Sequence, residues 1–286
     1  METTFTIFTP TYNRAEKLKR VYNSLLKQTF KDFCWLIIDD GSSDNTEEVV
    51  KNFKNLNIRY VYVKNGGKQR AYNKAIELAN SKYFICLDSD DYFLEYSLEK
   101  IAEYMKKTSS KQIGVGYLSG YDDKKYIGTK LIEKDISIFD QYNKYKVKGD
   151  KGLCFKLDLL KKYRFKVFEE EKFTTEAYLY NQISRTYTFL WVNEIYEIKE
   201  YLENGLTAKY DRLLCTNPKG QALYYNQMFL LKKDIIIASR YIKFCLIAKK
   251  KIKDIIKESN SKVFTILALP LAMYMYLKWR IKNEKK

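Results

Sequence analysis

The nine residues Tyr83–Asp91, YFICLDSDD, join a run of apolar residues directly to three carboxylates. The apolar part is too short for a helix and is rich in strand-forming residues, which predicts a buried strand of the parallel-sheet kind over Tyr83–Leu87. Open α/β sheets bind ligands at the carboxyl ends of their strands. The sequence therefore predicts a ligand site at Asp88, Asp90 and Asp91.

Two interpretations of these three acids are open on the nine residues alone. Carboxylates this close repel one another unless a positive charge lies among them, and Mg²⁺ or Mn²⁺ supplies that charge through oxygen ligands. An acidic turn that caps the next helix would use the same residues, because Asp is common in turns and at helix N-caps.

Composition limits the chemistry available to the 286-residue chain. A hydrophobic content of 46% predicts a packed core, in one large domain or one domain with an appendage. The five cysteines form no CxxC pair and histidine is absent, so a zinc site and a disulfide framework are not expected, and a reducing cytoplasm fits. Thr3–Pro10 is strand-like with no charged region before it, so no signal peptide is expected. Without histidine, a general base must be Asp, Glu, Lys or Tyr.

Strand and helix patterns alternate through the first ninety residues and predict a parallel sheet with helices on both faces. The expected strands are Phe5–Thr9, Phe33–Ile38, Ile58–Val63 and Tyr83–Leu87. The expected helices are Ala15–Gln28, a segment capped by Ser42 or Ser43 and ending near Phe53, and Gln69–Asn80. Right-handed crossovers would place Pro10, Asp40 and Asp88 on one edge of this sheet.

Between about Tyr92 and Phe168 the pattern is less regular, with a helical pattern over Leu94–Lys107 followed by several short strands. Helical patterns then cover Thr174–Ser184 and Gln221–Lys257, the second of which is long enough for two helices. Val263–Leu277 is an apolar stretch of 15 residues with Pro270 inside it and basic residues after it.

Four motifs occur in order along the first ninety residues: TPTYNR at 9–14, IIDDGSSDNT at 37–46, NGGKQRAYNKAI at 65–76 and LDSDD at 87–91. In this order and spacing they closely resemble the family 2 glycosyltransferases, which have a GT-A fold. The resemblance extends to EYLENGLT (200–207) and NPKG (217–220), which are similar to the C-terminal part of bacterial capsule and exopolysaccharide transferases. It fades after about Asn226.

The resemblance implies roles for individual residues in donor binding. Asp40 matches the acid that accepts a hydrogen bond from a uracil ring, Asp88 the acid that meets ribose or base, and Asp90 the metal ligand for Mn²⁺ or Mg²⁺. The remaining residues implied to bind the nucleotide are Thr9, Pro10, Tyr12, Lys68, Asn73 and Ser89. Asp91 would assist the site or cap the next helix.

One position departs from the family pattern. The family often has arginine just before the asparagine at position 73, whereas this chain has Tyr72 there and Arg70 two positions earlier. The cation on the phosphate side is therefore left open, with Lys68 favoured because two glycines before it allow close backbone approach.

The resemblance also implies an inverting transfer of a sugar from a nucleotide diphosphate, with a carboxylate base in a loop ahead of a helix. FEEEKFTTEAYL (168–179) fits that description, with Glu169, Glu170, Glu171 and Glu176 as candidates. Glu176 is favoured and Glu171 is second. Glu176 also fits a plain first-turn acid favoured by the helix dipole.

The net charge of +17 is concentrated at the C-terminus. Residues 232–286 carry 15 Lys and Arg against 4 Asp and Glu, a net charge of +11 in 55 residues. This distribution argues against nucleic acid as a partner. Fifteen helical residues span about 22 Å, short of the roughly 30 Å hydrocarbon core of a bilayer. Docking at an anionic membrane surface and packing as a core helix are both open for 263–277.

These expectations combine into one prediction. Residues 1–220 would form a GT-A catalytic domain, with 1–91 binding nucleotide and 92–220 binding acceptor. Residues 221–286 would form a basic, helical region for which membrane association is one of the two open interpretations. The protein would be a cytoplasmic, membrane-peripheral glycosyltransferase using a UDP-sugar and a glycan or polyprenyl-linked acceptor. The alternatives are a sugar nucleotidyltransferase, which TPTYNR does not suit, and a non-catalytic basic protein that binds nucleotide or lipid.

Overall fold

The computed structural model describes residues 2–200 and 210–284, and the chain divides into two compact units. The first unit comprises Met1–Arg164 and Ile183–Leu202, and the second comprises Phe165–Gln182 and Glu203–Lys286. This division rests on backbone proximity. The predicted boundaries at residues 91 and 220 concern nucleotide and acceptor binding, and they stay predictions.

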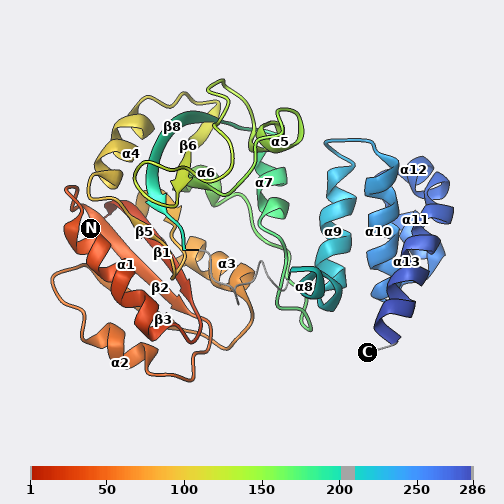
Figure 1. The fold of residues 1–286 in the computed structure, drawn as a ribbon, viewed down its shortest axis with the longest axis horizontal. Helices are drawn as coiled ribbons and strands as arrows, with labels where there is room; N and C mark the ends of the chain where they lie inside the picture. Colours follow the sequence, from red (N-terminus) through yellow and green to blue (C-terminus); the bar gives the residue numbers. More distant parts are fainter. Residues whose placement is uncertain (1, 201–209, 285–286) are drawn as a thin grey trace. The chain divides into compact units, whose positions relative to one another are not determined.

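Eight strands of the first unit form one sheet in the described residues, in the order β3-β2-β1-β4-β7-β6-β8-β5 (Figure 1). The strands are β1 (Thr3–Thr11), β2 (Phe33–Asp39), β3 (Ile58–Tyr62), β4 (Ser81–Cys86), β5 (Tyr92–Phe93), β6 (Gln112–Gly120), β7 (Lys151–Lys156) and β8 (Thr188–Ile198). β1 pairs in parallel with β2 and with β4, and β2 pairs in parallel with β3. The carboxyl ends of these four strands therefore share one edge, as predicted.

The second half of the sheet is more mixed than the sequence predicts. β7 runs antiparallel to both β4 and β6, and β5 runs antiparallel to β8, while β6 and β8 are parallel. The short strand β5 was not predicted, because two residues carry no readable periodicity.

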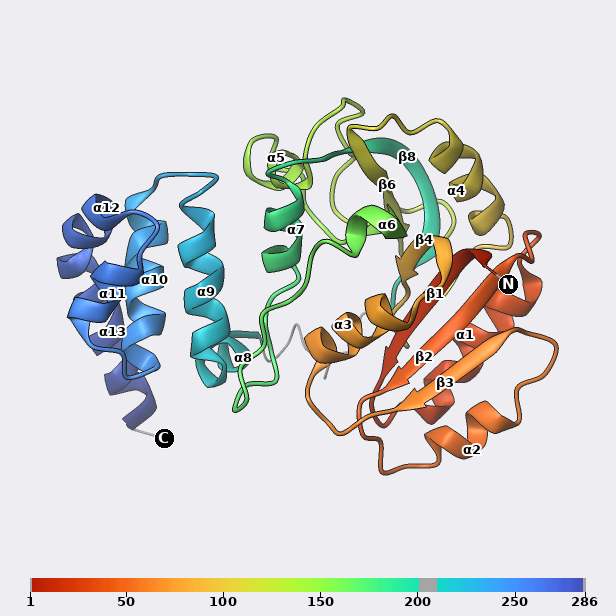
Figure 2. The same cartoon turned by 180° about the vertical axis from the view of Figure 1, so that it is seen from behind.

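Helices cover both faces of the sheet because side chains alternate along each strand. Phe5 and Ile7 of β1 join a buried cluster with α1 (Ala15–Lys27) and α4 (Ser97–Lys106). Phe8 points to the opposite face, where α3 (Lys68–Leu78) lies along the strands (Figure 2) and the Tyr72 ring is 5.4 Å from that of Phe8. The shorter helices of this unit are α2 (Thr46–Lys51), α5 (Ile138–Asn143) and α6 (Leu157–Leu160).

The predicted capping of α2 by Ser42 or Ser43 is wrong. The Asp44 carboxylate accepts the backbone N–H of Thr46 at 3.1 Å instead. Both serines are held by Asn13, whose N–H donates to Ser42 Oγ and whose Oδ1 accepts the Ser43 N–H. The helix also ends earlier than predicted, at Lys51.

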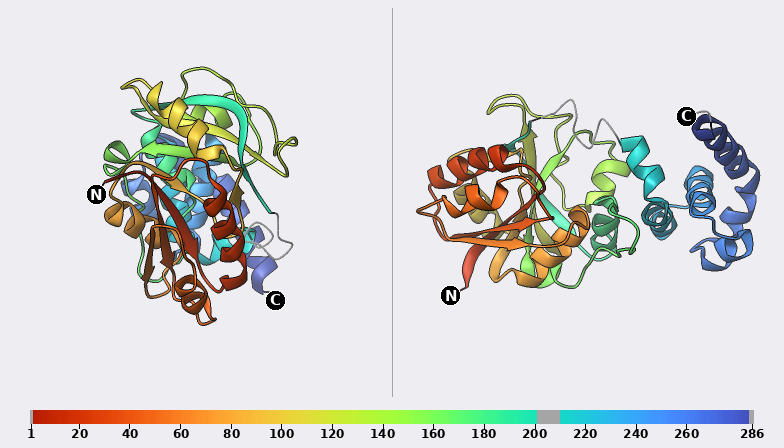
Figure 3. Two further views of the ribbon diagram at one scale, coloured as in Figure 1. Left: turned by 90° about the vertical axis from the view of Figure 1, so that its left-hand side faces the viewer. Right: turned by 90° about the horizontal axis from the view of Figure 1, so that it is seen from below.

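The second unit is helical in its described residues, and Figure 3 shows α10 to α13 gathered together. Its helices are α7 (Ala177–Ile183), α8 (Tyr210–Thr216), α9 (Pro218–Met228), α10 (Ile235–Ile247), α11 (Ile252–Glu258), α12 (Lys262–Leu267) and α13 (Leu269–Glu284). The stretch Gln221–Lys257 belongs to three helices, because Asp234 caps a new one by accepting the N–H groups of Ile236 and Ile237.

The apolar stretch 263–277 is also divided. α12 ends before Ala268, and α13 begins at Leu269 with Pro270 in its first turn, where a missing N–H costs no helical hydrogen bond. No helix within residues 2–200 and 210–284 has both the length and the apolar character needed to cross a bilayer.

Candidate functional site

The acids of LDSDD lie in a tight turn at the carboxyl end of β4. The backbone N–H of Asp91 donates to the carbonyl of Asp88 at 3.0 Å, which closes the turn. The next helix, α4, begins only at Ser97 with Tyr96 at its N-cap position. The interpretation that these acids cap the following helix is therefore wrong.

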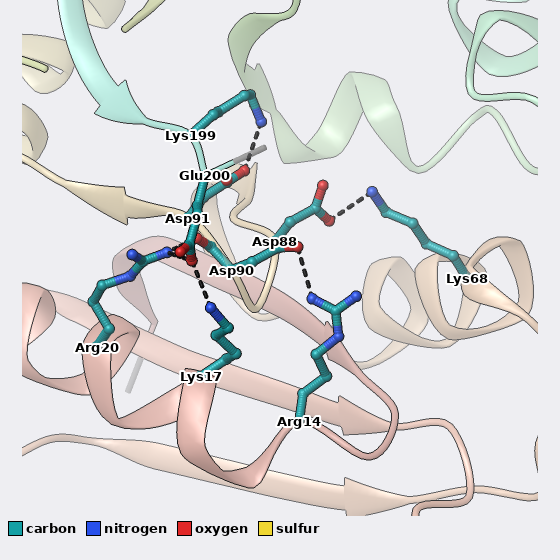
Figure 4. A network of polar contacts seen from close by, with 9 residues as sticks. All are labelled: Arg14, Lys17, Arg20, Lys68, Asp88, Asp90, Asp91, Lys199 and Glu200. Atoms are coloured by element: carbon teal, nitrogen blue, oxygen red, sulfur yellow. Dashed lines mark hydrogen bonds and ion pairs between the residues drawn. The ribbon is translucent and has the colours of Figure 1, made fainter. Parts of the chain in front are cut away.

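Each acid of the turn has its own cation, and the three cations come from three different parts of the first unit (Figure 4). Lys68 Nζ at the start of α3 lies 2.6 Å from Asp88 Oδ1. Arg14, in the loop after β1, places Nη1 2.7 Å from Asp90 Oδ2. Lys199, directly after β8, places Nζ 2.6 Å from Asp91 Oδ2.

Burial separates these three pairs into two kinds. The Asp88 and Asp90 side chains are 34% and 23% exposed. The Asp91 and Lys199 side chains are only 5% and 15% exposed, and Lys199 also pairs at 2.8 Å with Glu197, which is buried. Asp88 and Asp90 are thus open to a ligand, whereas Asp91 belongs to a buried ionic triad.

The pKa shifts follow this difference. Burial acts to raise the pKa of Asp88, but the positive charges of Lys68 and Lys199 outweigh it and leave the pKa below its usual range. Burial raises the pKa of Asp91 to about 8 although Lys199 opposes the shift, and the negative charge of Glu197 adds to it. The pKa of Lys199 is well above its usual value because Glu197 and Asp91 outweigh the effect of its burial.

A second layer of charges holds the turn from the side of α1. The Arg20 guanidinium donates to the backbone carbonyl of Asp90, and it also donates to Glu200 at 2.8 Å. Lys17 donates to the same Glu200 oxygen at 2.6 Å, and the Arg20 guanidinium lies 5.1 Å from the centre of the Tyr92 ring. The position of Asp90 is therefore fixed through its backbone, while its carboxylate remains partly exposed.

Asp40 anchors the loop that presents Lys68. Its two carboxylate oxygens accept the backbone N–H groups of Gly66 at 2.7 Å and Gly67 at 2.8 Å. Gly67 has a φ of +92°, a conformation that side-chain-bearing residues rarely adopt, and it precedes Lys68 at the start of α3. This role of Asp40 was not predicted, and its contact with a uracil ring stays a prediction.

The TPTYNR residues occupy the same edge in different environments. Tyr12 is exposed and Pro10 is half-buried. Thr9 is fully buried, and its Oγ1 accepts a hydrogen bond from Trp35 Nε1 at 2.9 Å, so its side chain serves the core. Ser89 is buried within the acidic turn, and Asn73 is half-buried on α3.

The acids suit a metal ion that brings further ligands with it. Within residues 2–200 and 210–284, no three side chains of Asp, Glu, Cys or His converge so as to hold a metal. Mg²⁺ in proteins is commonly bound by one or two carboxylates together with substrate phosphates. The oxygen donors Asp90 and Asp88, with Arg14 and Lys68 beside them, fit a metal–diphosphate pair better than a metal alone.

The acidic loop of the second unit is built on the NPKG motif. Both carboxylate oxygens of Glu171 accept N–H groups from the start of α9, those of Lys219 at 2.6 Å and Gly220 at 2.8 Å. A Cβ at Gly220 would lie 2.7 Å from the carbonyl oxygen of Phe173, so only glycine fits there. Burial raises the pKa of Glu171 although these hydrogen bonds oppose it. Glu171 acts here as a cap for α9.

The other three glutamates are more exposed. Glu169 and Glu170 are exposed, and a hydrogen bond from Lys219 lowers the pKa of Glu170. Glu176 is half-buried directly before α7 and accepts a hydrogen bond from the Tyr180 hydroxyl at 3.3 Å. Glu176 is thus less exposed than Glu169 and Glu170 and less buried than Glu171. Apart from Glu200, the EYLENGLT motif lies outside the described residues.

The sequence predicts Lys68 as a cation of the site but does not predict Arg14 or Lys199. Arg14 stands inside TPTYNR and Lys199 stands directly before EYLENGLT, so position beside a motif was a signal for both. Three neighbouring carboxylates also indicate that positive charge lies nearby, and basic side chains can supply this charge as well as a metal ion can. No sequence pattern indicated Arg20 or Glu197.

A family model described as glycosyl transferase family 2 matches residues 6–170, more than half of the chain. The chain therefore belongs to glycosyl transferase family 2, and the predicted class of enzyme is confirmed. Among solved structures, Staphylococcus aureus TarS in complex with UDP-GlcNAc resembles it with a TM-score of 0.64 at 17% identity, over 93% of this chain and 79% of that one. The mannosyltransferase PcManGT of Pyrobaculum calidifontis, in complex with GDP-Man and Mn²⁺, gives 0.57 at 14% identity, over 99% and 84%. These likenesses confirm the GT-A fold.

Two curated relatives show how far the sequence similarity extends. Poly(ribitol-phosphate) beta-N-acetylglucosaminyltransferase TarP of Staphylococcus aureus is 31% identical over 202 residues, which cover 68% of this chain and 59% of TarP. An uncharacterized glycosyltransferase of Mycoplasma genitalium is 43% identical over 106 residues, 35% of this chain and 36% of that protein. The matches thus span less than two thirds of the length of these relatives.

Proposed function

We propose that the protein transfers a sugar from a UDP-sugar to a hydroxyl of a glycan or polyprenyl-linked acceptor during synthesis of a cell-surface polysaccharide. The observation that carries the proposal is that four motifs meet at the carboxyl edge of β1, β2 and β4. Ion pairs join acidic and basic side chains there, and a metal ion could replace the basic partner while a diphosphate replaces the acidic one. The relatives support the donor class, since TarS is described in complex with UDP-GlcNAc.

In the proposed donor site, the exposed Tyr12 ring stacks on the base, with Pro10 beside it. Asp40, which already orders the loop of Lys68, accepts from the uracil, and Asp88 and Ser89 lie toward the ribose. Lys68 moves from Asp88 to the diphosphate, with Asn73 on the same helix. Thr9 takes part only through the core that supports this edge.

Asp90 would hold Mn²⁺ or Mg²⁺ together with oxygens of the diphosphate. When bound, such an ion offsets the negative charge that develops on the leaving phosphate. Arg14 and Lys68 then lose their carboxylate partners and become available for phosphate oxygens. Ion pairs in this region join five basic and five acidic side chains: Arg14, Lys17, Arg20, Lys68, Lys199, Asp88, Asp90, Asp91, Glu197 and Glu200.

Glu176 is proposed as the general base that takes the proton of the acceptor hydroxyl. Its half-buried carboxylate accepts a hydrogen bond from the Tyr180 hydroxyl just before α7, whereas both oxygens of Glu171 accept backbone N–H groups of α9, so a reacting Glu171 would release a helix end. Attack by the activated hydroxyl on the anomeric carbon breaks the bond to the diphosphate and inverts the configuration, as the family resemblance implies. We place this reaction in the cytoplasm, at the inner face of the membrane.

The proposal is tested by screening nucleotide sugars with and without Mn²⁺ for a rise in melting temperature, because a bound ligand stabilises the folded state. UDP-GlcNAc and UDP should raise the melting temperature of the protein in the presence of Mn²⁺. Slow hydrolysis of UDP-GlcNAc should release UDP. Release of pyrophosphate from UTP and a sugar phosphate would identify a nucleotidyltransferase instead. If no nucleotide changes the melting temperature or is hydrolysed, and Asp90→Ala behaves like the unaltered chain, the protein is non-catalytic.

A further inference from the structure

The helices α12 and α13 bury small side chains and leave several large apolar ones exposed. Thr265, Ala268 and Ala272 are completely buried. Val263, Leu267 and Tyr274, in contrast, are 66%, 65% and 61% exposed. A helix that packs on a protein core normally turns its large apolar residues inward. The core-helix interpretation of this stretch therefore accounts for its buried and half-buried residues, such as Phe264, but not for its exposed apolar ones.

The exposed apolar residues share helix faces. Along α13, Tyr274, Leu277 and Ile281 follow one another at intervals of three and four residues, which places them on one side of the helix. Along α12, Ile266 and Leu267 lie three and four residues after Val263, which places all three on one side of that helix. We call these six residues the apolar face. A concentration of large exposed apolar side chains is typical of a protein or membrane contact.

The cations beside the apolar face identify its partner. Lys278 and Lys282 are exposed one turn apart on α13, each directly after Leu277 or Ile281, so they flank the apolar face, and Lys262 is exposed at the start of α12. Long lysine side chains can keep their charge at a membrane surface while their stems lie along apolar groups. A second copy of the chain would bring an identical positive surface, in a segment of net charge +11, and would be repelled.

We propose that the apolar face of α12 and α13 docks in the interface of a bilayer rich in anionic lipid. The helix α13, with 16 residues, is too short and too basic to cross the bilayer, so it would lie in the plane of the headgroups. This deepens the proposed function and rests on it for its purpose, because a lipid-linked acceptor is found at such a surface. Docking itself requires neither donor nor acceptor.

The test is co-sedimentation of the full-length chain, without nucleotide, with vesicles of phosphatidylcholine alone or mixed with phosphatidylglycerol. The chain should bind the anionic vesicles and be released by salt. The triple variant Leu267→Ser/Leu277→Ser/Ile281→Ser should bind at least about tenfold more weakly. A matched control, Leu230→Ser/Ile235→Ser/Ile236→Ser, changes three other exposed apolar residues of the same unit and should bind like the unaltered chain.

Lys262→Gln/Lys278→Gln/Lys282→Gln should lose the preference for anionic lipid while keeping the melting temperature, because these side chains are exposed. Equal vesicle binding by the apolar triple variant and the unaltered chain would overturn the proposal. Sedimentation equilibrium supplies the other decisive outcome: an oligomer that the same triple variant dissociates, without vesicle binding, would assign the face to a second copy. If the unaltered chain binds anionic vesicles but transfers no sugar, the result counts against the proposed function and leaves the docking proposal standing.

Discussion

The open and the buried sides of the acidic turn carry the same chemical group in different surroundings. On the open side, Asp88 and Asp90 are partly exposed and paired with the long side chains of Lys68 and Arg14. On the buried side, Asp91 shares Lys199 with Glu197 out of reach of solvent. An exposed pair contributes little to stability and can be exchanged for a ligand, whereas a buried charge needs its partner. One motif thus supplies both ligand-binding groups and the support that holds them.

The largest expected effect is on stability, from breaking the buried side. Lys199→Met leaves Asp91 and Glu197 buried together without a cation, and should lower the free energy of unfolding by about 3–5 kcal/mol. Urea denaturation measures the change. Lys17→Met, at a more exposed cation of the same network, is the control and should cost at most about 1 kcal/mol. Equal losses from the two variants would contradict the distinction.

The next effect is on activity, from breaking the open side. Asp90→Asn removes the proposed metal ligand and should reduce Mn²⁺-dependent donor turnover by at least about 100-fold. Mutation of residues that only hydrogen-bond to metal ligands already lowers metal affinity or activity by about 10–100-fold. Its melting temperature should stay close to that of the unaltered chain because the Asp90 side chain is partly exposed. A variant that keeps its activity would remove Asp90 from the metal site.

A smaller effect is expected in the pH dependence of stability. The pKa of Asp91 is about 8 in the folded chain and about 4 in an unfolded one. Between these values the folded state binds more protons, so this group's contribution to stability falls as pH rises and is lost above pH 8. Over one pH unit, from about pH 6.5 to about 7.5, the free energy of unfolding should fall by at most about 1.4 kcal/mol. Asp91→Asn should flatten the plot of unfolding free energy against pH in this window. An unchanged slope would show that another group titrates.

The smallest effect concerns competition on the open side. Arg14→Gln frees Asp90 from its ion pair, so Mn²⁺ should bind the donor-free protein about three- to tenfold more tightly. Electron paramagnetic resonance of free Mn²⁺ measures this binding. Lys19→Gln, which changes an exposed cation of α1 paired with Glu16, should leave Mn²⁺ affinity unaltered. Weaker Mn²⁺ binding by Arg14→Gln would contradict competition between the guanidinium and the metal.

The sequence predicted the first half of the sheet well because its signals are local. Apolar runs such as Phe33–Ile38 end at polar residues, and the connecting helices repeat at short intervals, so strand order and the shared edge follow from general rules. The antiparallel pairing of β7 depends on contacts between residues far apart in the chain, such as Ile85 with Cys154, and no local pattern encodes it.

The candidate site was predicted as a set of acids, but its charge balance was not. Asp88, Asp90 and Asp91 are adjacent in the sequence, and nothing there tells which is buried. That depends on Lys199, which lies more than a hundred residues later and reaches Asp91 only through the pairing of β5 with β8. The capping role of Glu171 likewise depends on a helix that starts at Pro218.

Calorimetric titration of UDP with and without Mn²⁺ tests the division of the acidic turn most directly, on the unaltered chain, Asp90→Asn and Asp91→Asn. The account predicts that Mn²⁺ strengthens UDP binding to the unaltered chain and to Asp91→Asn by similar factors, and has no effect on Asp90→Asn. Loss of the Mn²⁺ effect in Asp91→Asn, with Asp90→Asn behaving like the unaltered chain, would contradict it.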